Sequence, residues 1–181
     1  MHVGGPCSPI VKVGDRVLRG QLIAEPSGLG ANIHASYTGE VTAVTETDIV
    51  IKADDKQNFD EYVKIPDTKT NLEAIAAAGV VGAGGAGFPT AVKLKTEIPQ
   101  GCFIANCAEC EPLLAHNIHQ IETDAAQLVR GVKYAMEITK APKGYIAIKP
   151  KHKKAVIELI KACRNEDNID VFPRLTVPSS L

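Results

Sequence analysis

Residues Gly79–Lys95 read GVVGAGGAGFPTAVKLK, and this stretch decides how the rest of the chain is interpreted. Five glycines stand between Gly79 and Gly87, and Pro89 follows them closely. Glycine reaches positive φ and leaves backbone N–H groups open to a ligand. Proline has a φ suited to the first turn of a helix. The stretch therefore predicts a glycine loop that leads into a helix, an arrangement that can hold a phosphate group.

The glycine spacing alone leaves two interpretations open. Gly82, Gly84 and Gly87 satisfy the pattern G-x-G-x-x-G, but that pattern identifies a dinucleotide site only where a strand precedes it. A helix is indicated instead, because Thr70 and Glu73 form a capping box ahead of the loop. No G-K-[ST] follows, which excludes a P-loop. The stretch is then either a structural tight turn or, as we favour, an anion- or cofactor-binding loop.

Composition narrows the class of protein. The chain has 181 residues, of which 45% are hydrophobic and 23% charged, as in soluble proteins with one or two small domains. A net charge of -1 and the lack of tryptophan give no indication of a nucleic-acid partner. No apolar run reaches membrane-spanning length, and the N-terminus has no signal-peptide pattern. We expect a cytoplasmic protein that reaches a membrane only through partners.

The cysteines do not form a recognisable framework. Their number is odd, and they stand at Cys7, Cys102, Cys107, Cys110 and Cys163. Cys107 and Cys110 form C-x-x-C, but no second pair stands at zinc spacing and no iron–sulfur ligand run is present. Metal binding, a dithiol redox role and ordinary packing remain open, and packing is favoured. We predict no metal ligand and no catalytic residue.

Residues 1–55 read as an all-β module. Short β-branched runs alternate with Gly-Asp and Arg-Gly turns over residues 11–24, and further strand patterns follow at 34–44 and 48–52. The module resembles the barrel-sandwich hybrid of biotinyl and lipoyl carrier domains. Such carriers present a lysine on a tight hairpin, whereas residues 25–32 contain none. A swinging-arm function is therefore rejected.

The second half of the chain reads as an α/β domain. Residues 56–70 are polar and suit a linker. Beyond them, helical and strand patterns alternate, which predicts a layered domain with a largely parallel sheet. The predicted strands lie at 101–105, 144–148 and 169–172, and the longer helices at 124–138, after a Thr123 cap, and at 150–163.

Two motifs carry a resemblance to a known family. Residues 82–95, GAGGAGFPTAVKLK, are similar to the flavin-binding loop of RnfC subunits of ion-translocating electron-transport complexes and of the NADH-oxidising flavin subunit of complex I. Residues 106–112, NCAECEP, resemble the second motif of these proteins, N-x-A-E-C-E-P in RnfC relatives. With the opening GPCSP at residues 5–9, the chain is most similar to RnfC-like members of the PrdC type, the electron-transfer partners of D-proline reductase.

This resemblance implies the fold and the site residues. It implies an α+β, two-part chain: a barrel-sandwich hybrid at 1–55, a linker at 56–70, and at 71–181 the first part of a Rossmann-like FMN/NADH-binding domain. The glycine backbone would lie against FMN, Lys93 would supply a cation, and the second motif would surround the flavin ring and nicotinamide. The cofactor-binding residues implied are Gly82, Gly84, Gly85, Gly87, Phe88, Lys93, Asn106, Glu109 and Glu111. A pair of solvated carboxylates at a helix start is the alternative for the two glutamates.

Departures from the family pattern limit which residue roles can be transferred from the family to this chain. Ala108 and Cys110 stand where complex I has Asp and Ser, so hydrogen bonding to the flavin must differ. Lys149 and Lys151 stand where complex I has acidic residues, which makes NADH a less secure expectation than FMN. The chain stops where relatives continue toward cysteine-rich cluster ligands. We therefore expect a truncated chain that holds no iron–sulfur cluster itself.

The expected function is that of an electron-transfer module rather than a stand-alone enzyme. It would pass electrons from NADH or a partner toward a reductase, which is D-proline reductase in the PrdC setting, within a larger redox complex. The alternative is a non-catalytic docking module of such a complex, with an incomplete flavin site.

Overall fold

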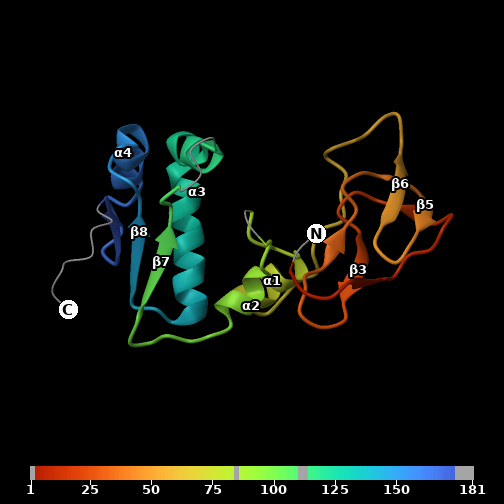
Figure 1. Ribbon diagram of the computed structural model, residues 1–181, viewed down its shortest axis with the longest axis horizontal. Coiled ribbons are helices and arrows are strands. Elements are labelled where there is room, and N and C mark those ends of the chain that lie inside the picture. The colour runs from red at the N-terminus through yellow and green to blue at the C-terminus, as the bar shows by residue number, and fades with distance from the viewer. Residues whose placement is uncertain (1–2, 84–85, 110–113, 174–181) are drawn as a thin grey trace. The chain divides into compact units, whose positions relative to one another are not determined.

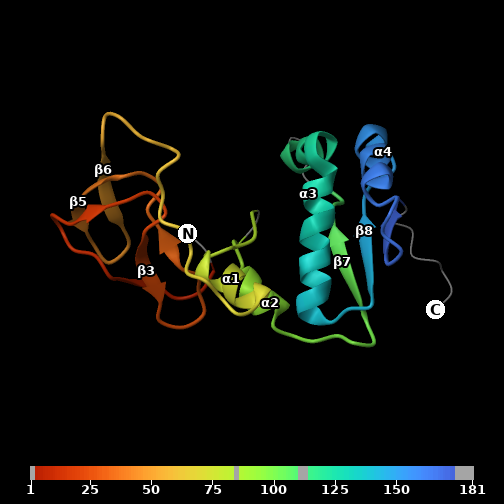
Figure 2. The same ribbon diagram turned by 180° about the vertical axis from the view of Figure 1, so that it is seen from behind.

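The computed structural model describes residues 3–83, 86–109 and 114–173. The chain forms two compact units, Met1–Lys95 and Thr96–Leu181. The first contains the β strands predicted for the N-terminal part and two short helices from the start of the predicted α/β part, and the second contains the remaining helices and strands of that part (Figures 1 and 2). The glycine-rich stretch belongs to the first unit.

The first unit is built from two open, three-stranded antiparallel sheets. One sheet has the order β1-β3-β4 and the other the order β2-β5-β6. A bulge between Val41 and Ala43 interrupts the pairing of β5 with β6. The strands are β1 (Cys7–Pro9), β2 (Arg16–Val17), β3 (Leu22–Pro26), β4 (Ile33–His34), β5 (Gly39–Val44) and β6 (Ile49–Ala53).

The core of the first unit lies between these sheets. Val17 and Val41 come from one sheet and Ile23 from the other, and all three are buried in one cluster with Ala35. In β5, buried Gly39 and Val41 alternate with exposed Glu40. This period of two is what a strand with one buried face requires.

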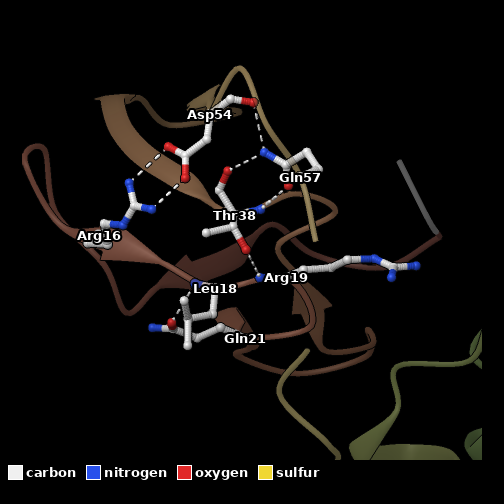
Figure 3. A network of polar contacts seen from close by, with 7 residues as sticks. All are labelled: Arg16, Leu18, Arg19, Gln21, Thr38, Asp54 and Gln57. Atoms are coloured by element: carbon white, nitrogen blue, oxygen red, sulfur yellow. Dashed lines mark hydrogen bonds and ion pairs between the residues drawn. The ribbon is translucent and has the colours of Figure 1, made fainter. Parts of the chain in front are cut away.

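Residues 57–63, within the predicted linker, pack onto the β module, and Figure 3 shows the first of them, Gln57. The Gln57 side-chain amide donates to the carbonyl oxygens of Thr38 at 2.9 Å and Asp54 at 3.0 Å. The backbone N–H of Val63 donates to the carbonyl of Arg19 at 2.8 Å. Boundaries at 55 and 70 remain predictions.

An ion pair lies beside the Gln57 contacts in the β module (Figure 3). The Arg16 guanidinium donates through two nitrogens to the carboxylate of Asp54, one of them at 2.9 Å. These hydrogen bonds hold the pKa of Asp54 below its ordinary value. Both groups are at the surface, where such pairs contribute little to stability.

Two short helices complete the first unit, α1 (Asn71–Ala77) and α2 (Thr90–Leu94). The predicted cap of α1 is present, because the Thr70 hydroxyl accepts the N–H of Glu73 at 3.2 Å. The Glu73 carboxylate accepts the N–H of Lys69 at 2.9 Å. Both bonds satisfy N–H groups that have no partner within the helix.

The second unit is a parallel sheet with helices on one face. Its sheet has the order β7-β8-β9, and α3 and α4 pack against each other. The elements are β7 (Cys102–Asn106), α3 (His116–Thr139), β8 (Lys143–Ala147), α4 (Lys153–Ala162) and β9 (Ile169–Phe172). The strands predicted at 101–105, 144–148 and 169–172 are thus confirmed to within one residue.

The core of the second unit lies between helices and sheet. Ile146, Ile148 and Leu159 are fully buried there. Gly144 lets α3 approach β8, because a Cβ at this position would lie 2.5 Å from the sulfur of Met136. On the opposite face of the sheet Ile104 is exposed. The described residues therefore form two layers.

The predicted cap of the long helix is wrong by one residue, because α3 joins two helices at a kink and the second begins after Asp124 rather than after Thr123. We expected a helix from Asp124 with Thr123 as its cap, whereas α3 begins at His116 and contains a non-helical Asp124 (φ -149°, ψ 66°). The Asp124 carboxylate accepts the N–H of Gln127 at 3.0 Å, which caps the second part of the helix. The Thr123 hydroxyl instead donates back to the carbonyl of His119 at 3.0 Å.

Within the described part of the chain, no helix is long and apolar enough to cross a membrane.

Candidate functional site

The glycine segment, defined as Gly79–Gly87, begins directly after α1. The N–H of Gly79 donates to the carbonyl of Ala76 at 3.0 Å, and that of Val80 to the carbonyl of Ile75 at 3.2 Å. Gly79 has a φ of +64°. Together these features form a Schellman motif, which ends a helix and turns the chain sharply. The helix predicted before the loop is therefore present.

Backbone hydrogen bonds close the glycine segment at its base. The N–H of Gly82 donates to the carbonyl of Phe88 at 3.0 Å, and that of Thr90 to the carbonyl of Val80 at 2.9 Å. Val81 and Pro89 form an antiparallel bridge between these bonds. The segment is thus a loop between two paired stems. The predicted site residues Gly84 and Gly85 lie outside the described residues.

Phe88 and Lys93 lie together after the loop. The Lys93 ammonium is 5.7 Å from the centroid of the Phe88 ring, a cation–π contact. Pro89 was predicted to open the helix, but it is the N-cap residue with a ψ of 118°, and α2 has five residues. So short a helix has little macrodipole to offer a phosphate. Positive charge at this place comes from the Lys93 side chain.

A cavity of about 940 Å³ lies between the glycine segment and the β module. Its walls include Gly79, Gly82 and Gly87 from the segment, and Cys7 and Asp48 from the module. This volume is within the usual range for small-molecule and cofactor sites. The glycine backbone is therefore open to a ligand of that size.

Asn106 and Glu109 lie in the second unit, where β7 ends. The Asn106 side-chain oxygen accepts the N–H of Ala108 at 3.1 Å. The Glu109 carboxylate accepts the Asn117 amide at 2.8 Å, and its backbone carbonyl accepts the Lys149 ammonium at 2.6 Å. The carboxyl ends of parallel strands are the usual place for ligands in α/β sheets. The predicted Glu111 lies outside the described residues.

Cys107 is next to these residues in the sequence, and its thiol is partly buried. Its burial raises the pKa of the thiol to about 11. At neutral pH the group is therefore a thiol rather than a nucleophilic thiolate. Its predicted C-x-x-C partner, Cys110, lies outside the described residues.

The predicted site residues thus fall into two groups. Gly82, Gly87, Phe88 and Lys93 belong to the first unit, and Asn106 and Glu109 to the second. Their role in cofactor binding remains a prediction. The sequence did not point to two side-chain amides that contact these regions. The Asn117 amide donates to the Glu109 carboxylate, and the Asn32 amide donates to a carbonyl at the end of α1. No local pattern marks either residue.

Two family models match the chain. The RnfC barrel sandwich hybrid domain matches residues 1–65. The Nuo51 FMN-binding domain matches residues 75–177, more than half of the chain. The chain belongs to the RnfC-like family. Both the predicted family and its two-part organisation are confirmed, with the glycine segment inside the FMN-binding match.

Curated relatives of this RnfC-like chain agree with the family models. A subunit of the Na(+)-translocating ferredoxin:NAD(+) oxidoreductase complex of Acetobacterium woodii is 37% identical over 95% of this chain and 43% of its own length. The corresponding subunit of the proton-translocating complex of Clostridium ljungdahlii is 35% identical over 89% and 39%. Cobalamin reductase PduS of Salmonella typhimurium is 45% identical over 56% and 22%. The chain thus spans less than half the length of these relatives.

Proposed function

We propose that this RnfC-like chain binds FMN and works as an electron-transfer module of a larger redox complex. The observation that carries the proposal is the glycine segment. It is a closed loop with left-handed glycines at Gly79 and Gly87, it lines a cavity of about 940 Å³, and it lies within the match to the FMN-binding domain. Bare backbone at such a loop allows close approach by a flat, phosphorylated cofactor.

Charged and polar side chains of the chain suit different parts of FMN. Lys93 is not among the residues that line the cavity, but it follows the loop and offers a cation that suits a phosphate. Glu46 and Asp48 are acidic residues of the cavity lining, so hydroxyl groups suit that part of the cavity better than a phosphate does. Asn106 and Glu109 supply polar atoms at the carboxyl end of a parallel strand. When bound, FMN would supply the electron chemistry, and the glycine segment with Lys93 would hold and orient it.

The names of two relatives support one part of the proposal about the electron donor and acceptor. Two of them are parts of ferredoxin:NAD(+) oxidoreductase complexes, which favours a nicotinamide cofactor as one redox partner. The Lys149 ammonium donates to the Glu109 carbonyl, so a positive charge lies beside the residues proposed to contact the flavin ring. We further propose the PrdC type, with electrons passing toward D-proline reductase. That finer assignment rests on GPCSP at residues 5–9 and on NCAECEP at residues 106–112.

Titration of FMN and riboflavin into the purified chain, followed by flavin fluorescence, tests the proposal. We expect FMN to bind more tightly than riboflavin, because Lys93 would hold the phosphate. Lys93→Gln should weaken FMN binding roughly 10- to 150-fold, since a hydrogen bond to a charged group contributes roughly 1.5–3 kcal/mol. Its effect on riboflavin should be small.

Lys95→Gln is the matched control, because Lys95 is a nearby exposed lysine beyond the end of α2. It should leave both affinities unchanged. Equal losses in the two variants would mean that nonspecific charge, rather than the position of Lys93, attracts the phosphate. A folded chain that binds neither flavin would overturn the proposal and favour the docking-module function.

A further inference from the structure

Asn32 of the β module contacts the end of α1, which lies 45 positions later in the sequence. Its side-chain amide donates to the carbonyl oxygen of Ala77 at 3.2 Å, and the bond is partly buried. Ala77 is the last residue of α1, where carbonyl groups have no partner within the helix. The Schellman bonds engage the carbonyls of Ile75 and Ala76. Asn32 therefore caps the next carbonyl, immediately before the glycine segment.

The backbone of Asn32 also lies against the first glycine of the segment. A Cβ on Gly79 would be 2.1 Å from the carbonyl oxygen of Asn32 and 3.0 Å from its carbonyl carbon. Only glycine can approach so closely while keeping a φ of +64°. Asn32 thus contacts the chain on both sides of the turn that starts the segment.

A second contact ties the other end of the segment to the β module. The N–H of Val3 donates to the carbonyl of Ala86 at 2.7 Å. Val3 precedes β1, and Ala86 precedes the last glycine of the segment. The module therefore holds the glycine segment near its beginning and near its end.

We propose that Asn32 is a positioning residue for the glycine segment, so that the β module sets the affinity of the loop for FMN. The inference rests on the proposed function, because it assigns a residue to that same site. Glycine-rich backbone loses more conformational entropy on ordering than any other. A loop held in place before binding avoids that cost when the ligand arrives.

Asn32→Ala removes the amide donor and tests the inference. It should raise the Kd for FMN about three- to tenfold, the effect of one lost hydrogen bond of roughly 1 kcal/mol. Hydrogen exchange of the backbone amides at 78–83 should become faster even without flavin. Gln57→Ala is the matched control, because it removes an amide that also donates to backbone carbonyls of the same unit. It should change neither quantity.

Asn32→Asp adds a readout that a merely structural role would not give. The side chain keeps its shape, but an ionised carboxylate repels the Ala77 carbonyl, so affinity at pH 7 should fall below that of Asn32→Ala. Near pH 4 the protonated acid can donate a hydrogen bond again. Affinity relative to wild type at the same pH should then recover.

The outcomes separate this inference from the proposed function. Wild-type affinity in Asn32→Ala, with unchanged exchange at 78–83, would overturn the inference and leave FMN binding intact. An Asn32→Asp variant that does not recover at low pH would also contradict it. If the wild-type chain binds no FMN, the proposed function fails, and the inference fails with it even if exchange still shows that Asn32 holds the loop.

Discussion

Gly79→Ala is expected to destabilise the first unit by about 3 kcal/mol or more, the sum of a left-handed backbone strain and an overlap with fixed atoms. The φ of +64° is unfavourable for alanine, and its Cβ would lie 2.1 Å from the carbonyl oxygen of Asn32. Backbone cannot move aside as a flexible side chain can. The variant should also lose FMN binding, because the turn that starts the glycine segment would open. Hydrogen exchange of the β-module amides measures the first effect, and flavin fluorescence the second.

Gly28→Ala is the control for this prediction. Gly28 has no left-handed φ, and a Cβ there would meet nothing within 4 Å. Its stability should stay within about 0.5 kcal/mol of wild type, as for most surface substitutions. A Gly79→Ala protein as stable as Gly28→Ala would show that the turn after α1 is not built as described.

Leu159→Ala is expected to destabilise the second unit by about 3 kcal/mol, as large-to-small changes in a close-packed core do. Leu159 lies on α4, has 0% exposure, and shares a cluster with Ile146 and Ile148 of the sheet. Urea unfolding followed by circular dichroism at 222 nm should report the change, because α3 and α4 contain most of the helical residues.

Ile157→Ala provides the comparison on the same helix. Ile157 is 51% exposed, so its truncation removes little buried apolar surface. We expect a change within about 0.5 kcal/mol. Similar losses in the two variants would contradict the assignment of the α4 face that packs on the sheet.

Local sequence patterns were sufficient for most of the second unit. Ile169–Phe172 was predicted as a strand, and β9 has those bounds. In this run the exposed Asp170 separates the apolar Ile169 and Val171, as in a strand with one buried face. The error at Thr123 has a simple cause. Threonine and aspartate are both good caps, and the apolar Ile118 and Ile121 before them already follow a helical spacing. Which of the two adjacent residues caps the helix depends on where the kink falls.

The long-range contacts of the glycine segment could not be predicted from the sequence. Its glycines and the helix before it were visible as motifs, and the family followed from those motifs. The contact from Asn32 joins residues 45 positions apart, and no local pattern predicts such a partner. Likewise, the glycine segment groups with the β module although it lies within the FMN-binding match. The hydrogen bonds from Val3 to Ala86 and from Asn32 to Ala77 join the segment and the helix before it to the β module, and such long-range contacts depend on tertiary structure.

Hydrogen exchange of the whole chain with and without saturating FMN tests whether the glycine segment binds the cofactor, because it shows which backbone amides the cofactor protects. We expect FMN to slow the exchange of the amides at 79–83 and 86–90. Riboflavin should protect the same amides only at higher concentration. Protection elsewhere, with exchange of the glycine segment unchanged, would contradict the assignment of this segment as the flavin site.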